Sequence, residues 1–151
     1  MQGPSNDKMN KSDPDALALL KNSYFTILVL DSNYSIDSTL EEFLSSEGYP
    51  VLMADSEKEA LAKTRRFEPS LILLDCELRG LRCLALLPEL LAENPYAAVV
   101  LLADKPSIAS VVEAMNLGVA DFFERPLDLE RLKRLIERQK TFFENRSREL
   151  N

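Results

Sequence analysis

Hydrophobic residues gather in five short runs along the chain, and stretches with a helical spacing of apolar residues separate these runs. The runs lie at residues 24–31, 50–54, 71–75, 97–102 and 120–123. A continuous apolar run is typical of a strand that is buried on both faces. Between the runs, apolar residues recur three and four positions apart, as at Ile108, Val111, Val112 and Met115. This spacing predicts amphipathic helices, and strands that alternate with helices predict a parallel sheet with right-handed crossovers.

The predicted fold is therefore α/β, a doubly wound five-stranded parallel sheet of the flavodoxin-like (βα)5 type with strand order 2-1-3-4-5. Residue types at the expected helix ends agree with this division. Gly48 and Gly118 stand where two helices should end, because glycine tolerates the left-handed conformation found there. Ser56 is a candidate N-cap for the second helix. Met53 and Met115 are expected to lie in the core.

The chain is expected to have three parts. Residues 1–22 are polar, contain Pro4 and Pro14, and are interpreted as a mobile N-terminal tail. Residues 23–140 form the domain, and residues 141–151 form an extension of the last helix or a linker. Apolar residues in the final segment show weak heptad character. An ordinary last helix with a frayed end and a linker to an output domain or a dimer coil both remain open.

Charge and composition narrow the function classes. The chain has 151 residues, a hydrophobic content of 46% and a formal net charge of −7. A single domain with a sizeable core is therefore expected. The negative charge argues against nucleic acid or an anionic membrane as a direct partner, because both would repel the domain. It says little about protein partners.

The two cysteines, Cys76 and Cys83, are too few and too close together for a disulfide framework. With no histidine in the chain, a metal site of the Cys/His type is excluded as well. We expect both cysteines to be reduced thiols, with Cys76 acting as a small buried hydrophobe. The N-terminus lacks a signal-peptide pattern, and no apolar run reaches the ~18 residues of a membrane span. A cytoplasmic protein is expected.

Two predicted strands end on an aspartate, Asp31 and Asp75. In a doubly wound sheet with this strand order the two strands are neighbours, and ligands bind at the carboxyl ends of the strands. Each acid by itself is equally consistent with a helix N-cap. Together, at neighbouring strand ends, they favour a functional site.

Four segments, in their order and spacing, resemble the receiver domain of bacterial two-component response regulators over residues 24–140. These segments are residues 27–31, 47–51, 69–75 and 117–127. The resemblance implies a phosphoprotein that acts in a phosphorelay and is not an enzyme. It implies that Asp75 accepts a phosphoryl group from a sensor histidine kinase or a phosphotransfer protein, with Mg²⁺ held by Asp31, Asp75 and Glu77. An output domain or effector protein, and a possible homodimer, are the other implied partners.

The expected site departs from the family's pattern at several positions. Ser32 stands where the family has a second acid, so Mg²⁺ should bind weakly. Ala103 replaces the hydroxyl residue that bonds the phosphoryl group. Arg125 replaces a lysine and is expected to pair with Asp75, bidentately if the geometry allows. Phe122 occupies the position of the switch aromatic. Asp104 adds a negative charge, for which a solvent-facing or helix-capping role is favoured.

Three function classes follow. The first is a phosphorylatable receiver with impaired switching. The second is a pseudo-receiver, a protein-interaction or dimerisation module that works without phosphate. A small-molecule binder of the flavodoxin kind is the third, although no glycine-rich phosphate loop follows Asp31 or Asp75. The resemblance also implies a cis peptide bond between Arg125 and Pro126.

Overall fold

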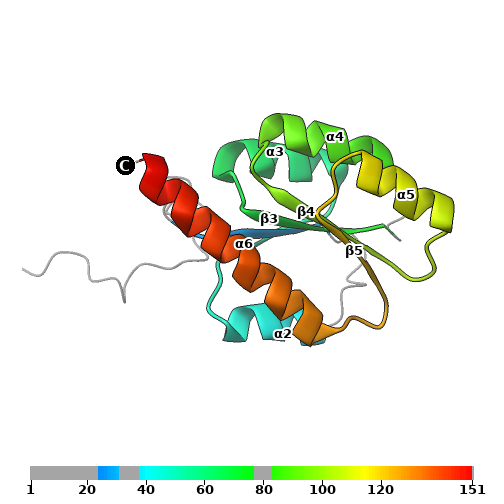
Figure 1. Ribbon diagram of the computed structural model, residues 1–151, viewed down its shortest axis with the longest axis horizontal. Coiled ribbons are helices and arrows are strands. Elements are labelled where there is room, and N and C mark those ends of the chain that lie inside the picture. Colours follow the sequence, from blue (N-terminus) through cyan, green and yellow to red (C-terminus); the bar gives the residue numbers. More distant parts are fainter. Residues whose placement is uncertain (1–23, 31–37, 77–82, 151) are drawn as a thin grey trace, which may run out of the picture.

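The computed structural model describes residues 24–30, 38–76 and 83–150, and in this part of the chain it contains one five-stranded parallel sheet with strand order β2-β1-β3-β4-β5 (Figure 1). The strands are β1 (Ile27–Leu30), β2 (Val51–Ala54), β3 (Leu71–Asp75), β4 (Ala98–Ala103) and β5 (Asp121–Glu124). The helices are α2 (Ser38–Ser46), α3 (Glu57–Phe67), α4 (Cys83–Glu93), α5 (Ile108–Asn116) and α6 (Leu129–Leu150). The predicted fold class and strand order are confirmed.

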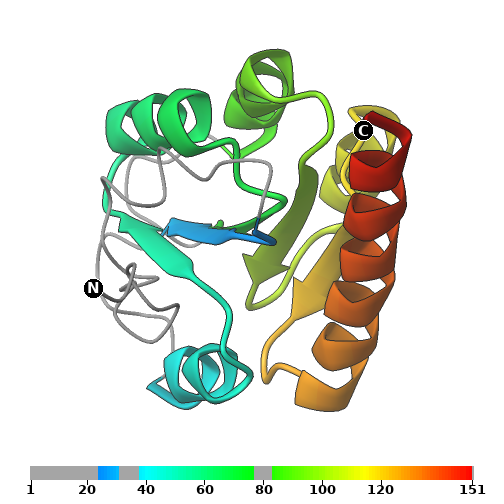
Figure 2. The same cartoon turned by 90° about the vertical axis from the view of Figure 1, so that its left-hand side faces the viewer.

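Helices cover both faces of the sheet, with α3, α4 and α5 on one face and α2 and α6 on the other (Figures 1 and 2). Alternate residues of each strand point to opposite faces. Leu28 and Leu30 of β1 pack into the cluster below α3 and α4, whereas Ile27 and Val29 pack into the cluster below α2 and α6. The central strands β1, β3 and β4 are therefore buried throughout, which explains their unbroken apolar sequences.

Local signals in the sequence set several helix ends. The Ser56 side chain accepts a hydrogen bond of 3.1 Å from the backbone N–H of Glu59 and caps α3, as predicted. Gly48 and Gly118 both have positive φ angles, 79° and 99°. No other heavy atom lies within 4 Å of a Cβ built on Gly48, so glycine is favoured there by backbone conformation rather than by lack of space.

Two core predictions are wrong. Met53 is 38% exposed and Met115 is 49% exposed. Met53 lies on β2, an edge strand of the sheet, and points away from the cluster that buries Leu52. In α5, which the structure describes throughout, Ala114 alone is buried, and Ile108 and Val112 of the predicted apolar stripe are exposed. The helix packs on the sheet through Ala114, and Ile108, Val112 and Met115 face away from the core.

Helix α6 continues through residues 141–150, for which the sequence allows either a frayed helix end or a linker. It remains helical to Leu150. Phe143 packs edge-on against Phe25 with ring centroids 6.0 Å apart, and the Arg146 guanidinium lies 4.2 Å from the centre of the Tyr96 ring. The far part of α6 therefore rests against the amino-terminal end of the sheet. The predicted tail, residues 1–22, lies outside the described residues.

Across the described residues, none of the helices has the combination of length and apolar character that crossing a membrane requires.

Candidate functional site

Asp75 is the last residue of β3, one of the strands buried in the middle of the sheet, and its side chain is fully buried. In register it lies opposite Leu102 of β4, and the backbone N–H of Cys76 donates to the Leu102 carbonyl over 2.8 Å. The ladder therefore continues one residue past Asp75 and holds its backbone in place. A carboxylate in such a position is stable only when a partner compensates for its lost hydration.

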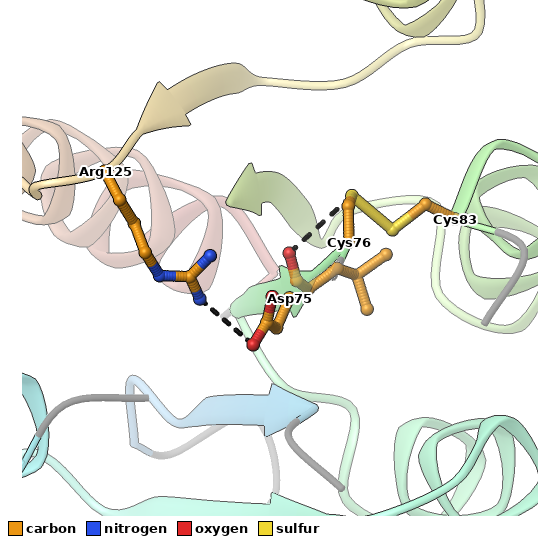
Figure 3. Close-up of a disulfide and its surroundings, with 5 residues drawn as sticks. Asp75, Cys76, Cys83 and Arg125 are labelled. Atoms are coloured by element: carbon orange, nitrogen blue, oxygen red, sulfur yellow. Dashed lines mark hydrogen bonds and ion pairs between the residues drawn. A yellow bond between two sulfur atoms is a disulfide. The ribbon is translucent and has the colours of Figure 1, made fainter. Parts of the chain in front are cut away.

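Arg125 is that partner. It follows β5, and its backbone N–H donates to the Ala103 carbonyl over 3.0 Å. Its Nη2 atom lies 3.0 Å from Oδ2 of Asp75, with 22% of the arginine side chain exposed (Figure 3). The predicted ion pair is confirmed, and the Arg125–Pro126 peptide bond is cis, as predicted.

The pairing differs from a bidentate fork. Within the described residues, Nη2 of Arg125 makes no aligned hydrogen bond, so its contact with Asp75 is an ion pair only. Nη1 instead donates to Oδ1 of Asp104 over 3.2 Å. Arg125 therefore bridges two carboxylates, one buried and one exposed. Asp104 faces solvent, as favoured from the sequence, with 60% of its side chain exposed. Its contact with Arg125 was not predicted, because no sequence signal shows that the end of β4 comes within reach of that side chain.

The guanidinium stays charged in this setting. Burial is the largest single influence on the pKa of Arg125 and lowers it, but Asp75 and then Asp104 raise it more in sum, so that the pKa lies above its ordinary value. The charge opposite Asp75 is thus permanent, unlike that of a lysine, whose pKa shifts readily on burial.

The other described site residues lie around this pair. Ala103 ends β4, is 4% exposed and provides no hydroxyl group. Phe122 of β5 is partly buried and packs against the core cluster on the α3 and α4 face. The structure thus brings Asp75, Ala103 and Arg125 together at the carboxyl ends of β3, β4 and β5. Asp31, Ser32 and Glu77 lie outside the described residues.

The predicted metal ligands stay a prediction, because two of the three lie outside the described residues. In the described part of the chain, no three His, Cys, Asp or Glu side chains are grouped closely enough to hold a metal ion. The chemistry of Asp75 fits a hard cation, because carboxylate oxygens are what Mg²⁺ prefers. The contact with Arg125 opposes it, because a cation at this edge would lie near a fixed positive charge.

A disulfide bond joins Cys76 to Cys83, with their Cα atoms 5.6 Å apart (Figure 3). The expectation of reduced thiols is wrong. The number of cysteines excludes a multi-bridge framework but not a single bond, and this Cα separation is in the normal range for disulfides. A usable signal was present in the sequence, because Cys76 follows a strand end and Cys83 stands seven positions later, where the next helix begins.

Comparison with known sequences decides the family. Residues 27–137 match the profile of the response regulator receiver domain. The chain belongs to this family. It is 33% identical to the transcriptional regulatory protein ZraR of Salmonella typhimurium over 112 residues, which is 74% of this chain and 25% of ZraR. This receiver domain therefore spans about a quarter of the length of that relative.

Solved structures agree with the assignment. The receiver domain of NtrX from Brucella abortus has a TM-score of 0.67 and 35% identity, with 75% of this chain and 96% of that chain covered. A response regulator protein from Burkholderia pseudomallei, described with a phosphorylated aspartic acid, a calcium ion and citrate, has a TM-score of 0.66 and 29% identity, with 71% of this chain and 63% of that chain covered. Receiver domains generally bind Mg²⁺ at the phosphorylation site.

Proposed function

We propose that this receiver domain accepts a phosphoryl group on Asp75 from a histidine kinase or phosphotransfer protein and switches weakly when it does so. The observation that carries the proposal is the buried carboxylate of Asp75 beside a permanent positive charge on Arg125. The Burkholderia pseudomallei relative, with its phosphorylated aspartic acid, supports the chemistry by analogy.

In the proposed transfer, an oxygen of Asp75 attacks the phosphorus atom of a phosphohistidine. The N–P bond of the donor breaks as the O–P bond of the aspartyl phosphate forms. Asp31, Asp75 and Glu77 would hold Mg²⁺, which when bound neutralises charge on the phosphoryl oxygens. Arg125 leaves the carboxylate and pairs with a phosphoryl oxygen, which it is positioned to do because its guanidinium already lies 3.0 Å from Oδ2 of Asp75.

Weak switching follows from Ala103 and Asp104. A hydrogen bond to a charged group contributes ~1.5–3 kcal/mol, and Ala103 has no group to make one. Asp104 holds Nη1 of Arg125 and adds a negative charge near the phosphoryl oxygens. Both features disfavour the phosphorylated conformation by roughly a factor of ten or more, since 1.4 kcal/mol corresponds to tenfold. Mg²⁺ binding is expected to be weak for a similar reason, because Ser32 offers no charge.

A second candidate is a pseudo-receiver that binds a partner or dimerises without phosphate. The ion pairs from Arg125 to Asp75 and Asp104 favour it, because they compensate the charges of all three side chains with no phosphoryl group present. In either case the module is not expected to be an enzyme. We propose that it works in the cytoplasm as part of a longer regulatory protein, connected to an output domain or effector through α6.

Titration with beryllofluoride and Mg²⁺, followed by amide chemical shifts, tests the proposal. Binding should shift amides around Asp75 and Arg125, with small shifts at Phe122. Asp75→Asn should abolish the response, whereas Asp104→Asn, a matched loss of one carboxylate that spares the acceptor, should keep or strengthen it. Absence of any response in the unaltered domain would favour the pseudo-receiver.

A further inference from the structure

We infer that Cys76 and Cys83 form a reversible redox couple that sets how readily Asp75 is phosphorylated, with the disulfide as the less reactive form. The part that concerns phosphorylation rests on the proposed function. The couple itself rests on the position of the bond, one residue from Asp75 (Figure 3).

The bond ties the end of the central strand to a helix. Cys76 directly follows Asp75, and its backbone is held to β4 by the hydrogen bond to Leu102. Cys83 is the first residue of α4, which packs on the sheet through Leu86, Leu87 and Leu90. Two contacts therefore hold the backbone next to Asp75: the hydrogen bond to β4 and the covalent disulfide to α4. Phosphoryl transfer requires Arg125 to leave Asp75 and the Asp75 carboxylate to meet the donor in line, and a restrained backbone next to Asp75 resists the adjustment that this alignment needs.

The site accommodates the reduced state as well. The Sγ atom of Cys76 lies 4.0 Å from the carbonyl oxygen of Leu74, a position in which a thiol donates a weak hydrogen bond. A disulfide sulfur carries no hydrogen and makes no such bond. Cys83 is 9% exposed within the core cluster, where a thiol packs as a small hydrophobe. Breaking the bond leaves no buried polar group without a partner, so the fold is expected to persist in both states.

The two sulfurs also differ in exposure and in electrostatic surroundings, and this difference suits thiol–disulfide exchange. Cys76 is partly exposed and offers the sulfur that an external thiolate attacks. Cys83 stands at the N-terminus of an 11-residue helix, where the helix dipole stabilises the thiolate that leaves. In the reducing interior of a cell, where we propose that the protein works, disulfides are mostly transient and sense redox state rather than hold a fold together.

The balanced reaction uses glutathione disulfide as the oxidant. The thiols of Cys76 and Cys83 lose two protons and two electrons in total, and the bond between their sulfurs forms. The S–S bond of glutathione disulfide breaks, and two molecules of glutathione leave with those protons and electrons. Reduction is the same reaction in reverse.

The first measurement is the redox equilibrium. The full chain is held in glutathione buffers of graded potential, free thiols are alkylated, and intact masses are recorded. We expect a single reversible two-electron transition in the unaltered protein and none in Cys76→Ser or Cys83→Ala. A bond that fails to form in oxidising buffer, or that forms between two chains, would overturn the couple.

The second measurement is the rate of phosphoryl uptake from acetyl phosphate in the oxidised and reduced forms. Reduction should raise the rate roughly tenfold, because it releases the backbone next to Asp75 from its covalent bond to α4 and lets the carboxylate align with the donor. Cys76→Ser should react at the faster rate in both buffers. Equal rates in the two forms would overturn the inference but leave the proposed function standing. No uptake in either form would instead overturn the proposed function, and with it the coupling to phosphorylation.

Discussion

Replacing Arg125 with alanine should destabilise the domain far more than removing an exposed arginine. The Asp75 side chain is fully buried, and Arg125 keeps 22% of its side chain exposed. Breaking a fully buried ion pair costs ~3–5 kcal/mol, because one charge is left without compensation. Since water partly reaches Arg125, we expect the lower end of this range, about 3 kcal/mol of the free energy of unfolding. The contact with Asp104, which is mostly exposed, adds little.

Urea denaturation followed by circular dichroism measures this loss. Arg65→Ala is the matched control, because Arg65 also forms an ion pair, with Glu93 at 2.7 Å, but its side chain is 72% exposed. That control should lose much less stability. Adding Asp75→Asn to Arg125→Ala should recover most of the loss, because it removes the stranded charge. A loss no larger than that of the control, or a double variant no more stable than Arg125→Ala, would refute the reasoning.

Three further predictions concern the switch, the metal and pH. Ala103→Ser restores a hydroxyl at the end of β4 and should raise beryllofluoride affinity by roughly tenfold; unchanged affinity in a fluorescence or calorimetric titration would count against the role of this position. Ser32→Asp should tighten Mg²⁺ binding by a large factor, and amide shifts on Mg²⁺ titration measure it; equal affinity would sink the idea. Burial, then Glu47 and Glu137, raise the pKa of Tyr49 above its usual value of 10.0. Because the pKa of Tyr49 is higher in the folded state than in the unfolded state, its contribution to stability is fully present below pH 10 and is lost as pH rises through the folded-state pKa. In Tyr49→Phe the free energy of unfolding should therefore fall less steeply above pH 10. The same steepness in the variant and the unaltered domain would contradict this.

The pattern of the sequence was sufficient to predict the sheet, whereas the contact between Asp75 and Arg125 was predicted from the resemblance to receiver domains. Buried strands have unbroken apolar sequences, and the order of strands and helices fixes which strand ends are neighbours. The role of Arg125 also depended on its position before Pro126. Its second contact, with Asp104, depends on the path of the chain after β4, and the spacing of apolar residues along the sequence does not predict that path.

The errors have physical causes as well. The stripe of Ile108, Val112 and Met115 shows the helical period, but a period does not show whether another element covers that face. The number of cysteines does not predict the disulfide, because a count rules out a framework of several bonds but not a single bond. Their pairing is a matter of distance, and the 5.6 Å between the Cα atoms of Cys76 and Cys83 depends on how α4 packs against the sheet.

Phosphoryl labelling of Asp75 tests the central claim most directly. The unaltered domain is incubated with acetyl phosphate and Mg²⁺, in reducing buffer, beside Asp75→Asn and Asp104→Asn. Mass spectrometry then counts the phosphoryl groups and locates them by peptide mapping. We predict one phosphoryl group on Asp75 in the unaltered domain and in Asp104→Asn, and none in Asp75→Asn. No incorporation, or incorporation that persists in Asp75→Asn, would contradict the account and favour a module that works without phosphate.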